Sequence, residues 1–285
     1  LPIEHQIEKK HGKHLPADKV RELCRAFANE QVERQKKDFI RLGVLGDWDH
    51  PYLTMNFNIE AGIVRALGKI YQNGYLYQGQ KPVNWCIDCG SALAEAEVEY
   101  EDKTSPAIDV GFEVQSSAHP LLEQAFGVDL PTNAQVYAVI WTTTPWTLPA
   151  NQAVSVHPDF DYVLIQSDRG LLILAKELNE ACLERYHLAG QTLATCKGQA
   201  LEHMPLQHPF EVRPVNIICG KHVTLEAGTG LVHTAPAHGL DDYVVGQKYN
   251  LPSESPVDGN GKFLDSTPLV GGLSVWKANE TVIDT

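Results

Sequence analysis

The stretch that decides the fold of this chain is WTTTPWTLPAN, which runs from Trp141 to Asn151. It ends an apolar, strand-like run with the hydroxyls of Thr142, Thr143 and Thr144. Pro145 follows directly and cannot donate to a sheet ladder, so the strand is expected to end there. Exposed threonines on a strand often reflect β propensity alone. The proline and tryptophan that follow them favour another interpretation, in which the three hydroxyls line a pocket.

A second polar stretch, GTGLVHTAPAHGLDDY, spans residues 228–243. A glycine-flanked strand leads into a turn with His233 and His238, and then into an acidic helix start. Asp241 and Asp242 have a plain structural explanation there, because carboxylates cap helices and complement their dipoles. The functional alternative is a carboxylate that pairs with the ammonium group of a substrate. The spacing of the two histidines does not fit a zinc motif.

Short β-type runs surround both stretches and are separated by Gly, Pro, Asn and Asp. We predict strands at residues 107–114, 135–141, 162–166, 171–174, 215–219 and 230–233, and short helices at 176–186 and 241–249. This pattern predicts a mostly β, barrel-type domain with peripheral helices.

The first part of the chain has a helical pattern. Apolar residues recur at helical spacing over 18–41 and 58–71, and a further helix begins near 277–284. We therefore predict two domains, residues 1–98 and 99–285, of which the first is α/β with a helical segment and the second mostly β. The uncertainty of such a boundary is several residues.

Composition places the chain among globular proteins, with 43% hydrophobic and 21% charged residues. No apolar run approaches the roughly 20 residues of a membrane helix. The net charge is −13, and residues 1–50 hold ten basic and nine acidic side chains, which leaves −14 for the rest. An acidic chain binds polyanions poorly without specific contacts. Six cysteines without a disulfide-type spacing indicate a reducing, cytoplasmic setting.

Cys86 and Cys89 form the one close pair of cysteines, in WCIDCG at residues 85–90. Two thiolates at this spacing can hold a metal from a tight turn, but a structural zinc ion needs four ligands. The pair is therefore interpreted either as half of a zinc knuckle or as two ordinary cysteines in a turn. The sequence contains no phosphate loop, no GxGxxG and no GxSxG nucleophile elbow.

Together these motifs resemble the isoleucyl-tRNA synthetases, a family of class I aminoacyl-tRNA synthetases. KDFIRLGVLGDWDHPYLTM at residues 37–55 resembles a catalytic-domain segment shared by the Ile, Val and Leu enzymes. Residues 85–100 resemble the start of the large insertion in that domain. The stretches at 141–151 and 228–243 resemble the two core motifs of the editing site. The form Thr-Thr-Thr-Pro-Trp indicates the isoleucine branch, since the relatives typically carry Thr-Thr-Arg-Pro.

The resemblance implies a partial Rossmann-type catalytic domain followed by a β-barrel-like editing domain. It also implies ATP with Mg²⁺, the 3′ end of tRNA(Ile), and isoleucine and valine as partners, in a monomer without membrane contact. The HIGH and KMSKS motifs are absent from this sequence. Because the chain starts at Leu1 rather than Met, we expect a segment of a longer ligase, with those motifs and a partner CxxC for any zinc outside it.

The resemblance assigns a proofreading role. One methylene group contributes only about 1–3 kcal/mol to the discrimination between isoleucine and valine, and the isoleucine enzyme is the known example of this limit. Valine that has been attached by mistake must therefore be removed. Asp242 would bind the ammonium group, Thr142, Thr143 and Thr144 would hold the ester or a water, and His233 would wall the side-chain pocket. Trp146 and Asn151 would orient the terminal adenosine or support the loop. The vicinal hydroxyl of the tRNA would assist the attacking water.

Two alternatives stay open at the level of sequence. One is a free-standing hydrolase that edits mischarged tRNA in trans. The other is a tRNA-binding module without chemistry, against which the intact threonines, His233 and Asp242 count. Deacylation of valyl-tRNA separates the two hydrolytic interpretations from the binding module.

Overall fold

The computed structural model describes residues 2–285, which form two compact units, one up to Gly79 and one over Gln80–Thr285. Residues 80–98, which the sequence analysis placed in the first domain, lie in the second unit. The assignment of two domains with a boundary near residue 98 stays a prediction.

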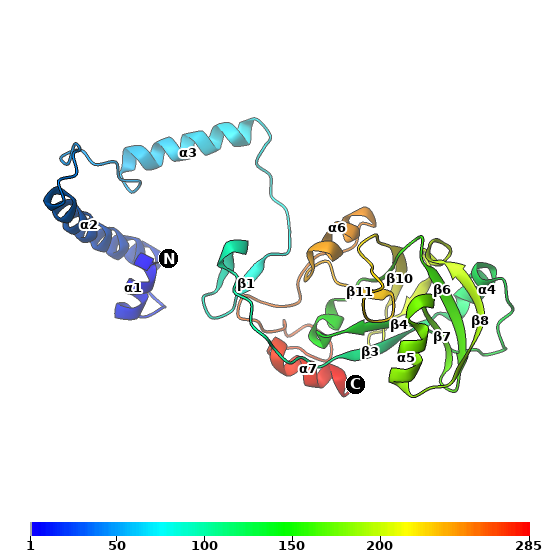
Figure 1. The fold of residues 1–285 in the computed structure, drawn as a ribbon. Coiled ribbons are helices and arrows are strands. Elements are labelled where there is room, and N and C mark those ends of the chain that lie inside the picture. Colours follow the sequence, from blue (N-terminus) through cyan, green and yellow to red (C-terminus); the bar gives the residue numbers. More distant parts are fainter. Residues whose placement is uncertain (1) are drawn as a thin grey trace. The chain divides into compact units, whose positions relative to one another are not determined.

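The first unit consists of three helices, α1 (Pro2–His11), α2 (Ala17–Arg41) and α3 (Phe57–Gln72) (Figure 1). The predicted helices at 18–41 and 58–71 are confirmed to within one residue at each end, whereas α1 was not predicted. Arg25 of α2 donates to the carbonyl of Met55 and pairs with Glu60 of α3. Neither α2 nor α3 buries a single residue.

The second unit is built on one nine-stranded mixed sheet. Its strands are β3 (Ile108–Val114), β4 (Val136–Thr142), β5 (Ala153–Val156), β6 (Asp161–Ser167), β7 (Gly170–Ala175), β8 (Gly190–Lys197), β9 (Pro205–Gln207), β10 (Pro214–Cys219) and β11 (Leu231–Thr234). Their order is β11-β5-β10-β9-β3-β4-β7-β6-β8. The pairs β5–β10 and β4–β7 are parallel, and the other pairs are antiparallel.

All six predicted strands are present in this sheet, which also contains β5, β8 and β9 as strands that were not predicted. The prediction of a barrel is wrong with respect to closure. The edge strands β11 and β8 have no ladder between them in the part of the chain that the structure describes. The sheet nevertheless curves until β11 lies beside β4 without pairing to it. Strand count and alternation do not distinguish a strongly curved open sheet from a closed barrel, because closure depends on pairing between distant strands.

Helices cover this sheet, and the fold is therefore mixed α/β. They are α4 (His119–Phe126), α5 (Asn179–Tyr186), α6 (Leu240–Lys248) and α7 (Val275–Ile283), together with the 3₁₀ turns η1 (Glu95–Glu97), η2 (Ser116–Ala118), η3 (Pro145–Ala150), η4 (Lys176–Leu178) and η5 (Gly198–Leu201). The predicted helix at 176–186 corresponds to η4 and α5, and that at 241–249 to α6. Within the described residues, no helix has the length and apolarity that a membrane crossing requires.

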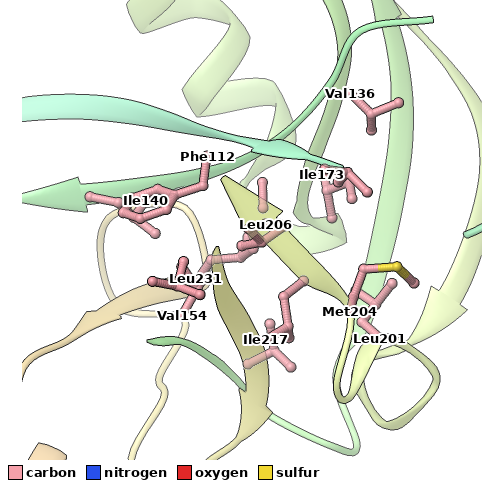
Figure 2. Packing of buried hydrophobic residues seen from close by; sticks show 14 of the residues in the cluster. Phe112, Val136, Ile140, Val154, Ile173, Leu201, Met204, Leu206, Ile217 and Leu231 are labelled. Atoms are coloured by element: carbon pink, nitrogen blue, oxygen red, sulfur yellow. The ribbon is translucent and has the colours of Figure 1, made fainter. Parts of the chain in front are cut away.

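Alternation along β4 explains how the sheet is buried on both faces. Ile140 contributes to the main core, whereas its neighbour Val139 packs with Cys182 of α5 on the other face. Side chains from three strands, Ile140, Val154 and Leu231, gather around the main interior (Figure 2). This core fixes β4 and β11, the two strands whose ends carry the polar stretches.

Two short strands lie before the main sheet. β1 (Asn84–Cys86) and β2 (Ser91–Leu93) form an antiparallel hairpin, in which Cys86 ends β1 and Cys89 lies in the turn. The indole nitrogen of Trp85 donates to the carbonyl oxygen of Gly259 over 2.8 Å. This contact ties the hairpin to the loop that precedes α7.

Candidate functional site

The two polar stretches meet at one cavity because β4 and β11 lie side by side. β4 ends at Thr142, and Pro145, with its fixed φ, begins the turn η3. β11 ends at Thr234, and α6 begins at Leu240. The cavity between them has a volume of about 320 Å³. Its lining consists of Trp141, Thr142, Thr143, Thr144, Thr147, Val232, His233, Ala235, His238, Gly239 and Asp242.

The three consecutive threonines play different parts. The hydroxyl oxygen of buried Thr142 accepts the Thr144 backbone N–H over 3.1 Å and lies 3.3 Å from the Thr144 hydroxyl. Thr143 and Thr144 are exposed, and the Thr143 hydroxyl has no partner among the described side chains and backbone groups. Thr142 therefore shapes the strand end, and Thr143 and Thr144 are the exposed threonines of the cavity lining.

His233 is held at both ring nitrogens. The Asn151 amide nitrogen donates to Nδ1 over 2.7 Å and to the Ala153 carbonyl over 2.8 Å. The carbonyl can only accept, which fixes the amide orientation and makes Nδ1 the acceptor. Nε2 then carries the proton and donates to the Thr147 hydroxyl over 3.0 Å, which in turn donates to the Thr144 carbonyl over 2.8 Å. The ring has no lone pair left for a substrate proton.

The histidines around the cavity are kept neutral. Burial, with smaller contributions from His238 and His208, lowers the pKa of His233 to about 3. Burial lowers the pKa of His238 to about 4 and is the main cause of a similar value at His208. The His238 ring lies edge to face with Trp146, with centroids 4.9 Å apart. His238 Nε2 is buried without a hydrogen-bond partner in the described part of the molecule.

Asp242 lies in the first turn of α6 and supplies the one carboxylate of the cavity lining. Its Oδ2 accepts the Ala235 backbone N–H over 3.0 Å. Burial raises the pKa of this carboxyl, and the hydrogen bond from Ala235 opposes that rise. A half-buried carboxylate with one anchored oxygen is suited to bind a cation, since the positive charge would offset its partial desolvation.

The structure brings Thr142, Thr143, Thr144, His233 and Asp242 together as the sequence analysis expected. Asn151 and Trp146 do not line the cavity. Asn151 is fully buried and orients His233, and Trp146 packs on His238 while its backbone N–H donates to Asn279 of α7 over 3.0 Å. Both residues therefore support the loop at residues 143–151 and do not line the cavity.

Six lining residues were not predicted as site residues, and they are Trp141, Thr147, Val232, Ala235, His238 and Gly239. Thr147 and His238 lie within the quoted stretches, but nothing in their spacing separates them from loop residues. Gly239 precedes α6 directly and was noted there only as part of the motif.

Cys86 and Cys89 do not make a metal site with the residues described. They form no disulfide, and the Cys89 backbone N–H donates to Cys86 Sγ over 3.3 Å, the main reason why the Cys86 pKa is lowered. No cluster of three or more His, Cys, Asp or Glu side chains with metal-binding geometry occurs within residues 2–285. Two thiols are half of a tetrahedral set, so the described residues do not fit a structural zinc ion.

Comparison with known proteins gives the following matches. The family model for class I tRNA synthetases (I, L, M and V) matches residues 1–249. Over its whole length the chain is 71% identical to the isoleucine--tRNA ligase of Nitrosomonas europaea, and over 99% of it 65% identical to that of Dechloromonas aromatica. The chain spans 31% of the length of each of these relatives.

Among solved structures, the chain resembles the editing domain of the P. knowlesi cytosolic leucyl-tRNA synthetase, with a TM-score of 0.50 and 10% identity. The match covers 66% of this chain and 96% of that domain. At this identity the likeness concerns the fold alone.

Proposed function

Because this chain belongs to the family of class I tRNA synthetases, we propose that it is a segment of an isoleucine--tRNA ligase whose cavity at Thr142 and Asp242 hydrolyses mischarged valyl-tRNA(Ile). The complete ligase would attach isoleucine to its tRNA in the cytoplasm. Enzymes of this class use ATP and Mg²⁺ for that step. No part of it is assigned to this chain, whose sequence has neither HIGH nor KMSKS.

One observation carries the proposal: a half-buried carboxylate and exposed hydroxyls line the same cavity. Asp242 would pair with the α-ammonium group of the misattached amino acid, and the first turn of α6 holds that carboxylate in place. The hydroxyls of Thr143 and Thr144 would bind the ester or the attacking water. An aminoacyl ester carries a cation and a carbonyl on neighbouring atoms, which matches this pairing of groups.

In the reaction, water adds to the ester carbonyl carbon, the bond to the ribose oxygen breaks, and that oxygen takes up a proton. His233 is excluded as the proton acceptor because both of its nitrogens are engaged. The chain therefore supplies binding and orientation, which convert the reaction of a bound water into an effectively unimolecular step. The vicinal hydroxyl of the terminal ribose is left as the assisting group.

Selection against isoleucine follows from the rigidity of the wall. His233 is fixed between Asn151 and Thr147, so its ring cannot turn away from a larger side chain. Displacing it would break buried hydrogen bonds, each of which is expensive to leave unmade. Valine would fit against this wall, and the additional methylene of isoleucine would not.

Asp242→Asn tests the proposal, because asparagine keeps an oxygen for the Ala235 N–H while removing the charge. We expect hydrolysis of valyl-tRNA(Ile) by the full-length protein to fall by about 100-fold, the loss typical of a charge-assisted contact. The matched control is Asp241→Asn, since Asp241 is the exposed neighbour outside the cavity lining. Unchanged deacylation in Asp242→Asn would refute the assignment. Binding of tRNA without any hydrolysis by the wild type would support a binding module instead.

A further inference from the structure

The residue before α6, Gly239, has no backbone reason to be glycine. Its φ of −125° and ψ of 139° describe extended backbone that any L residue adopts. It also occupies the N-cap position, where Ser, Thr, Asp or Asn would stabilise the helix at least as well. The absence of a side chain therefore requires another explanation.

The space that a side chain would need at Gly239 is filled by the Asp242 carboxylate. A Cβ atom added there would lie 2.8 Å from Asp242 Oδ2, 3.0 Å from its Cγ and 3.4 Å from its Cβ. These are its three nearest neighbours. Ordinary van der Waals contacts of a Cβ atom begin at about 3.4 Å, so the distances to Oδ2 and Cγ are too short. A side chain at position 239 would therefore push primarily against the carboxylate.

The turn around the carboxylate is closed on its other side by Ala235. The Ala235 carbonyl accepts the backbone N–H groups of His238 over 2.9 Å and Gly239 over 3.3 Å, while its own N–H holds Asp242 Oδ2. The Gly239 carbonyl in turn accepts the Tyr243 N–H over 2.9 Å, which begins α6. Opening the turn would cost several of these bonds, whereas rotation of the carboxylate costs one.

We propose that Gly239 is a positioning residue: its missing side chain keeps the Asp242 carboxylate on the Ala235 N–H and aimed at the ammonium group of the substrate. The inference rests on the proposed function and adds a residue that acts only through Asp242. The three nearest neighbours of a Cβ atom at position 239 all belong to Asp242, so the added atom displaces this carboxylate first.

The test compares Gly239→Ala with Gly239→Ser. Both add the Cβ atom, but serine also supplies a hydroxyl that caps a helix well, whereas alanine does not. If Gly239 positions Asp242, both variants lose valyl-tRNA(Ile) hydrolysis by about 10- to 100-fold, the range expected for a misplacement of about 1 Å. If the residue matters only as a helix cap, serine retains the activity and the proposal is overturned. Gly259→Ala, which would make only an ordinary 3.4 Å contact with Trp85, is the control.

A binding measurement separates positioning from a general structural effect. The probes are 3′-amide analogues of valyl-adenosine, which carries the ammonium group, and of isovaleryl-adenosine, which lacks it. The wild type should bind the ammonium analogue at least 10-fold more tightly, and Gly239→Ala should lose that preference while binding isovaleryl-adenosine as before. An unchanged preference in Gly239→Ala overturns this inference. If Asp242→Asn keeps the preference for the ammonium analogue, the proposed function itself is overturned.

Discussion

The two units of this chain differ in where their apolar side chains lie. In the first unit, Ile63, Val64 and Leu67 of α3 are about half to two-thirds exposed, and α2 and α3 bury no residue. In the second unit, Phe112 and Ile140 of the central strands are completely buried. The first unit thus has helices with little tertiary packing of their own, whereas the second has a core that holds two distant polar stretches at one cavity. A cavity built from residues distant in the sequence needs a packed core such as that of the second unit.

The largest effect that would test this comparison is on stability. Phe112→Ala should lower the free energy of unfolding by about 3–5 kcal/mol, because it leaves a cavity in a packed core. Leu67→Ala should change it by no more than about 0.5 kcal/mol, since a half-exposed helical side chain loses little on truncation. Denaturant unfolding of both variants, followed by tryptophan fluorescence, provides the measurement. Equal losses would show that α3 packs far better than its exposure indicates.

The same difference explains what could be predicted from the sequence. Helices α2 and α3 were placed to within a residue because the 3.6-residue period is local information. The cavity residues were brought together only by resemblance, since Thr144 and Asp242 are almost a hundred residues apart. Closure of the sheet could not be predicted, because whether the edge strands β11 and β8 pair is decided by long-range packing. The support of His233 by Asn151 and Thr147 likewise follows from that packing.

A smaller effect concerns acid, to which the two units should respond differently. The pKa values of His208, His233 and His238 are about 3 to 4 in the fold, against about 6.5 in an unfolded chain. At pH values between about 4 and 6.5, the unfolded state binds more protons than the folded state. The free energy of unfolding therefore falls as the pH drops below about 6.5. Each histidine contributes at most about 1.4 kcal/mol per pH unit. The raised pKa of Asp242 acts in the opposite direction, but as a single group.

Hydrogen exchange at pH 7 and pH 5.5 measures this response unit by unit. Protection should fall in the strands of the second unit, whereas the first unit, whose histidines are all exposed, should show no such loss. The control is His208→Gln, because His208 Nε2 donates to the Leu148 carbonyl over 3.1 Å and glutamine keeps a donor. That variant should weaken the pH dependence by roughly one histidine's share. A second unit equally stable at both pH values would contradict the assignment of neutral buried histidines.

The smallest expected effect is that of zinc on the hairpin of Cys86 and Cys89. This hairpin belongs to the second unit, yet it is exposed and is held by the contact of Trp85 with Gly259 rather than by a core. Two thiols bind zinc weakly, and a ligand present near its dissociation constant stabilises a protein by only about 0.4 kcal/mol. Thermal unfolding with and without micromolar zinc should therefore show almost no shift, and Cys86→Ser should behave like the wild type. A large stabilisation by zinc that disappears in Cys86→Ser would mean that other residues of the chain complete the metal site. The hairpin would then be held by a metal ion, unlike the helices of the first unit.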